Sequence, residues 1–121
     1  MRRFAIYTLS VLGLSVLAGT AGADELTFDL YNDALDDLKV EFYAVDSDRA
    51  WPGGDQVYLL EDDETREFHL ECYAGEKICF GAWVGSYDDP IVYWGVGPGG
   101  GYGCEDCCGY CGDEPIVGDL Y

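Results

Sequence analysis

The sequence predicts an all-β protein, a small antiparallel β-sandwich of about six to seven strands with a disulfide-stapled Gly/Cys-rich C-terminal tail. Three observations support this fold. Short segments alternate apolar and polar side chains, turn residues recur about every ten positions, and no window of residues 24–121 shows the apolar stripe of an amphipathic helix. Six cysteines in a 121-residue chain offer the covalent support that a small core needs.

The first three strands are predicted by their alternation and by the loops between them. Residues 26–31 and 38–45 alternate apolar with polar side chains, which indicates strands buried on one face. Their expected inward-facing residues are Leu26, Phe28, Leu30, Leu38, Val40, Phe42 and Ala44. A polar connection, 32–37, separates them. A loop broken by proline and glycine, 46–55, precedes a short strand at 56–60.

Three further strands are expected at 66–73, 77–84 and 91–96. The first of these follows an acidic turn and shows the clearest alternation in the chain. Its expected inward-facing residues are Phe68, Leu70 and Cys72, and its outward-facing residues are Glu67, His69 and Glu71. The tail, 97–121, has little apolar content apart from its aromatic residues. We therefore expect cysteines rather than a hydrophobic core to hold the tail.

The first 23 residues have the pattern of a secretory signal peptide. Arg2 and Arg3 precede an uncharged apolar run, and a small-x-small motif ends at Ala23. Cleavage after Ala23 would leave a single domain, 24–121, with no membrane span. A retained N-terminal membrane anchor is the alternative. The interpretation as a signal peptide predicts a secreted or periplasmic protein in an oxidising compartment.

The charge of the chain is strongly negative. The whole sequence carries a net charge of −18, and the expected mature domain carries −20 because its 24 carboxylates face four cations. Those cations are Lys39, Arg49, Arg66 and Lys77. Such a surface repels nucleic acid and anionic membranes. The charge is consistent with solubility in a salty habitat and, as an alternative, with the binding of a cation.

One disulfide is predicted from hairpin geometry. If Gly75 and Glu76 form a two-residue hairpin loop, Cys72 lies directly opposite Cys79, at a separation that a disulfide can span. The alternative is a bond from this hairpin to the cysteines of the tail. The sequence alone favours the bond between Cys72 and Cys79.

The tail holds four cysteines in the pattern C-x-x-C-C-x-x-C. This tail quartet consists of Cys104, Cys107, Cys108 and Cys111. In a reducing compartment the spacing would indicate zinc. Export instead favours two disulfides within the quartet, in a pairing that avoids the strained bond between neighbouring Cys107 and Cys108. A redox role is disfavoured because Glu105 and Asp106 oppose thiolate formation. A metal site in the quartet remains an alternative.

Catalytic constellations are scarce in the expected mature domain. His69 is the only histidine, and Ser47 and Ser86 are the only serines. His69 is expected on a solvated strand face between acidic residues, so a hydrolytic triad is not predicted. Residues 95–100 match G-x-G-x-x-G but precede a Cys-rich segment rather than a helix, so we interpret them as a turning loop. We therefore predict neither an enzyme nor a cofactor.

The remaining candidates are binding sites. Acidic loops that include Asp46 and Asp48 offer oxygen ligands for calcium, and Trp51 could stack on a sugar ring. We expect a non-enzymatic binding or structural module. The alternatives are a metal-binding protein that uses the tail quartet or the acidic loops, and a carbohydrate-binding module that uses exposed tryptophan. The sequence does not identify the partner. A cation or a glycan is compatible with these features, and nucleic acid is not.

Overall fold

The computed structural model describes residues 4–8 and 24–121. The expected cleavage site after Ala23 lies outside these residues, as does most of the expected signal peptide. Within that segment, β1 (Phe4–Thr8) pairs antiparallel with the last strand of the chain. Among the described residues, no helix is long and apolar enough to cross a membrane.

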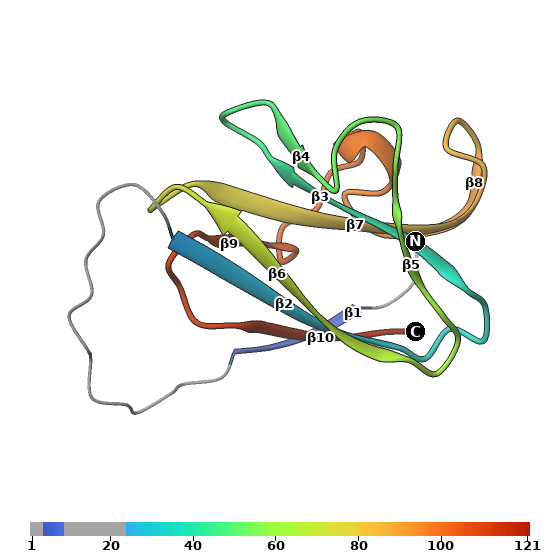
Figure 1. Cartoon of the computed structure of the whole chain (residues 1–121). Helices are drawn as coiled ribbons and strands as arrows, with labels where there is room; N and C mark the ends of the chain where they lie inside the picture. The colour runs from blue at the N-terminus through green and yellow to red at the C-terminus, as the bar shows by residue number, and fades with distance from the viewer. Residues whose placement is uncertain (1–3, 9–23) are drawn as a thin grey trace.

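The strands form two sheets that pack face to face (Figure 1). Sheet A has the order β1-β10-β2-β6, with β2 at Asp24–Asn32, β6 at Thr65–Cys72 and β10 at Ile116–Leu120. Sheet B has the order β4-β3-β7-β8, with β5 on β3 and β9 on β7. Its strands are β3 (Leu38–Ala44), β4 (Arg49–Trp51), β5 (Tyr58–Leu60), β7 (Lys77–Gly85), β8 (Pro90–Gly95) and β9 (Cys108–Tyr110). The predicted all-β fold is confirmed, and each of the six expected strands is present.

The core lies between the sheets and consists of the alternating inward-facing residues. Every inward-facing residue predicted on the strands now labelled β2, β3 and β6 is buried. Phe42 of sheet B packs against Phe28 and Phe68 of sheet A, with ring centroids 4.8 and 5.1 Å apart. These tilted aromatic contacts join the two sheets at their centre.

The tail contributes a strand to sheet A and residues to the core. The expectation that cysteines rather than a core hold it is therefore wrong. Its last strand, β10, inserts beside β2, and Ile116 and Leu120 are buried in the core. The pairing of β10 with β2 is parallel, unlike the antiparallel pairs expected throughout. Parallel neighbours need a long connection between them, and here the whole chain from β3 to β9 separates β2 from β10.

The disulfide between Cys72 and Cys79 is also a wrong prediction. The structure pairs Cys72 with Cys111 and Cys79 with Cys108. The reason is that β6 belongs to sheet A and β7 to sheet B, so the segment between them is a corner from one sheet to the other and not a hairpin. A turn closes this corner, with the Glu76 N–H donating to the Tyr73 carbonyl at 2.9 Å.

The prediction of two disulfides within the tail quartet is wrong. Only the bond between Cys104 and Cys107 is internal to the quartet. Cys108 bonds instead to β7 of sheet B, and Cys111 bonds to β6 of sheet A. These bonds match the alternative considered for Cys72 and Cys79, in which they pair with cysteines of the tail. All six cysteines lie in the described part of the chain and all are disulfide-bonded. The tail is therefore fastened separately to each sheet.

A glycine-rich loop, residues 96–103, covers the outer face of sheet B (Figure 1). It contains the short 3-10 turn η1 (Pro98–Gly100), so the G-x-G-x-x-G match is a tight turn here. Gly81 of β7 allows the loop to approach, because a Cβ atom at that position would lie 2.1 Å from the Gly97 carbonyl oxygen. Tyr102 anchors the end of the loop by stacking on Tyr93, at 4.2 Å between ring centroids.

Candidate functional site

The glycine-rich loop and the β3–β4 hairpin enclose a hollow on the outer face of sheet B, which we call the β3–β4 pocket. Its volume is about 470 Å³. The side chains that define it come from β3, from the β3–β4 hairpin, from the β7–β8 turn and from the loop: Glu41, Tyr43, Asp48, Arg49, Tyr87 and the backbone of Gly99. Three stretches that are distant in sequence therefore meet at one site: the β3–β4 hairpin with β3 itself, the β7–β8 turn and the glycine-rich loop.

Glu41 lies at an outward position of β3 but is only 6% exposed. The alternation of β3 points its even-numbered neighbours into the core and leaves Glu41 on the opposite face. That face would be open to solvent without the glycine-rich loop, because Gly81 lies directly opposite Glu41 on β7 and the loop rests on Gly81. The loop thus converts a surface carboxylate into a buried one.

Tyr43 links the carboxylate to the loop. Its hydroxyl donates to Glu41 Oε1 at 3.0 Å and accepts from the Gly99 N–H at 2.7 Å. Burial, followed by the negative charge of Glu41, raises the pKa of Tyr43 far above its usual value. The phenol therefore stays protonated and continues to donate to the carboxylate.

Glu41 itself is held in an unfavourable environment for an ionised group. Burial raises the pKa of the Glu41 carboxyl, and the hydrogen bond from Tyr43 only partly opposes this effect. Within the described residues Glu41 forms no ion pair. A buried carboxyl in a hollow with a raised pKa is a recognised mark of a functional site.

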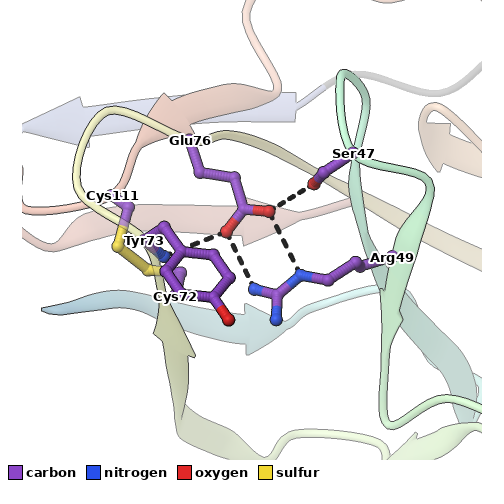
Figure 2. Close-up of polar contacts among 6 residues, drawn as sticks. All are labelled: Ser47, Arg49, Cys72, Tyr73, Glu76 and Cys111. Atoms are coloured by element: carbon purple, nitrogen blue, oxygen red, sulfur yellow. Dashed lines mark hydrogen bonds and ion pairs between the residues drawn. A yellow bond between two sulfur atoms is a disulfide. The ribbon is translucent and has the colours of Figure 1, made fainter. Parts of the chain in front are cut away.

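A second cluster fixes the wall of the pocket (Figure 2). Arg49 of β4 donates from Nη2 to Glu76 Oε1 at 2.8 Å and from Nε to Oε2 at 3.2 Å. Its guanidinium also lies over the rings of Trp51 and Tyr73, at 4.8 and 4.9 Å. Ser47 donates to the same carboxylate. The β3–β4 hairpin is thereby tied to the corner between the two sheets.

The clamp around Glu76 stabilises the ionised carboxylate. Burial opposes ionisation, but the hydrogen bonds from Ser47, from the Tyr73 N–H and from Arg49 outweigh it, so the pKa of Glu76 lies below its usual value. The disulfide between Cys72 and Cys111 lies beside this cluster in Figure 2. Glu76 is thus a satisfied structural group, whereas Glu41 is not.

The structure separates the site residues predicted from sequence. Asp48 lines the β3–β4 pocket, while Asp46 is exposed on the turn between β3 and β4. Among the described residues, no group of three His, Cys, Asp or Glu side chains is arranged to hold a metal ion. The sulfurs of the tail quartet are disulfide-bonded and present no thiolates in this structure.

The candidate aromatic platform and the histidine have other contacts. Trp51 is half-buried against the core, and Arg49 covers one face of its ring. His69 lies on the outer face of sheet A, where it contacts Glu25 at 2.8 Å and Glu67 at 3.2 Å. The hydrogen bond to Glu25 is the main reason that the pKa of His69 is raised. Neither residue lines the β3–β4 pocket.

Sequence reasoning missed Glu41 and Tyr43. An acidic and an aromatic residue at outward positions of a strand are ordinary features of a solvated sheet face. The available signal was Gly81 together with the glycines of residues 95–101, because glycine allows two backbone segments to approach each other closely. That signal does not say which face is approached.

Replacement of Glu41 by glutamine is expected to stabilise the fold at pH 7 by about 1 kcal/mol, within the range of common stabilising substitutions, because it removes a buried charge. Because the pKa of Glu41 is raised in the folded state, its ionisation weakens the fold as pH rises above 4.5, the ordinary value. Glutamine keeps an oxygen that can accept from Tyr43. Urea denaturation of E41Q and wild type across pH measures the difference.

The stabilisation by E41Q is expected to depend on pH, and an exposed glutamate provides the control. Below the ordinary pKa, Glu41 is protonated in both the folded and the unfolded chain, so the advantage of E41Q is expected to shrink there. E105Q makes the same chemical change at an exposed residue and is expected to leave stability unchanged. An E41Q variant that is less stable than wild type at pH 7 would contradict the unfavourable burial of Glu41.

Comparisons with protein-family models, with curated proteins and with solved structures found no match for this chain. The geometry of the β3–β4 pocket is therefore the basis on which a function is proposed.

Proposed function

We propose that this chain is an exported, non-enzymatic binding module and that the β3–β4 pocket is its ligand site. The observation that carries the proposal is the buried Glu41 carboxylate, which lies in the hollow and is linked through Tyr43 to the loop that covers it. A buried polar group that converges on a hollow is typical of small-molecule sites.

The walls of the pocket support a preformed site. Arg49 and Glu76 fix the β3–β4 hairpin, and the contact of Gly97 with Gly81 fixes the loop. The disulfide from Cys79 to Cys108 fastens β7, which lies under the loop, to the tail. A site that is rigid before binding loses less conformational entropy when a ligand arrives.

The chemistry of the lining favours binding over catalysis. The lining residues are carboxylates, tyrosines, one arginine, and small apolar or glycine residues, and none of them is a serine, cysteine or histidine. A nucleophile with an adjacent base, as acyl transfer requires, is therefore not among them. Glu41 is positioned to accept from a bound molecule, because the hydrogen bond from Tyr43 leaves most of its acceptor capacity unused.

The disulfides bear on where the protein works. Three disulfides in a chain of this size indicate an oxidising environment. Together with the apolar N-terminal segment and its small-x-small motif, they support our proposal that the protein acts in the periplasm or extracellular space.

Amide NMR spectra of the exported, oxidised protein test the proposed site. The protein is titrated separately with calcium chloride and methyl α-glucoside, for the metal and carbohydrate alternatives, and with n-butylammonium chloride, for an organic cation. We expect at least one of them to shift the amide signals of Ala44, Gly99 and Gly100, which line the pocket. If none of the three shifts those signals while the spectrum remains that of a folded protein, the pocket is not the binding site.

A further inference from the structure

We propose that the β3–β4 pocket binds an alkylammonium ion, the charged end of a primary amine, with Glu41 as its counter-ion. This inference rests on the proposed function, and it adds the chemical class of the ligand. It follows from the unused acceptor positions of Glu41, from the positions of the lysine and arginine side chains, and from the composition of the pocket walls.

Glu41 has acceptor capacity that the protein leaves unused. An ionised carboxylate offers about four acceptor positions. Among the described residues Glu41 receives one hydrogen bond, from Tyr43, although only 6% of the residue is exposed to solvent. A buried charge without a partner is strongly unfavourable, and a cation that binds beside it relieves the penalty.

Across residues 24–121 no Lys or Arg forms an ion pair with this carboxylate. Arg49 directs Nε and Nη2 to Glu76, and Lys39 donates from Nζ to the Gly85 carbonyl at 2.6 Å. Arg66 lies over the rings of Tyr58 and Phe68, at 5.4 and 4.8 Å from their centroids.

The fourth cation, Lys77, lies opposite Tyr110 at the start of β7, four residues from Gly81 and its partner Glu41. None of the four forms an ion pair with Glu41 in the described structure. Since the mature domain would carry a net charge of −20, an external cation is also attracted to it at long range.

The walls favour an organic cation over a metal ion. Calcium takes six to eight oxygen ligands, and the described residues offer no group of three acidic or other metal-binding side chains at one place. The pocket is instead lined by the phenol rings of Tyr43 and Tyr87 and by apolar side chains such as Val96. Aromatic rings attract ammonium ions, and apolar walls suit an alkyl chain. A hollow of about 470 Å³ also accommodates a small organic molecule.

The test is a titration with n-butylammonium chloride, compared with 1-butanol, which has the same chain and no charge. We expect n-butylammonium to shift the Gly99 and Gly100 amide signals and to bind wild type about tenfold more tightly than E41Q. E105Q removes the same charge at an exposed site and is expected to bind like wild type. Affinity in wild type is expected to rise with pH as Glu41 ionises, and this rise is expected to be absent in E41Q.

Three outcomes would overturn the inference. These are equal binding of n-butylammonium and 1-butanol, equal binding to wild type and E41Q, and equal losses in E41Q and E105Q, which would mean a general attraction to the acidic surface. If 1-butanol or methyl α-glucoside shifts the pocket amides and n-butylammonium does not, the binding module stands and the cation class fails. If no probe shifts those amides, both proposals fail.

Discussion

Simultaneous replacement of Cys72 and Cys111 by alanine is expected to lower the free energy of unfolding by about 4 kcal/mol. The bond joins residues 39 positions apart, and a cross-link over a long loop restricts the unfolded chain most. It also fastens the tail beside β6, next to the Glu76 clamp. Urea denaturation of the oxidised variant and wild type, followed by tryptophan fluorescence, measures the difference.

The bond between Cys104 and Cys107 is the matched control for this measurement. It spans only three positions, so the same double replacement there is expected to cost about 2 kcal/mol. Equal losses in the two variants would contradict the view that Cys72 and Cys111 anchor the tail to sheet A. A C72A/C111A variant as stable as wild type would do the same.

Replacement of Gly81 by alanine is expected to lower the free energy of unfolding by about 3 kcal/mol and to open the β3–β4 pocket. The added Cβ atom would lie 2.1 Å from the Gly97 carbonyl oxygen, which is backbone and can yield only if the glycine-rich loop lifts. Lifting the loop would break the hydrogen bond from the Gly99 N–H to Tyr43 and expose Glu41 to water. The pKa of Glu41 is then expected to move back toward its ordinary value.

Two measurements separate these effects. Thermal or urea denaturation reports the loss of stability in G81A, and carboxyl carbon NMR across pH reports the titration of Glu41. G103A is the control in the same loop, because a Cβ atom at Gly103 meets nothing within 4 Å and its stability is expected to be unchanged. If G81A and G103A behaved alike, the loop would not rest on Gly81.

Much of the fold follows from local pattern. The strands β2, β3 and β6 were predicted with the correct buried face, because a period of two places alternate side chains on opposite sides and only one side packs against the other sheet. The segment after Pro115 has the same period, since Ile116 and Leu120 are apolar and lie four positions apart. It was missed because glycine and aspartate interrupt it, and because its partner β2 is almost ninety residues away.

The sequence by itself determined the all-β class, the inward-facing residues of the main strands and the presence of disulfides, since each depends on local periodicity or on composition. Tertiary structure decided how the cysteines pair, because that depends on whether β6 and β7 share a sheet. It also decided that Glu41 is buried. An outward-facing carboxylate becomes a candidate binding group only when a loop from the far end of the chain lies across it, and no local pattern carries that information.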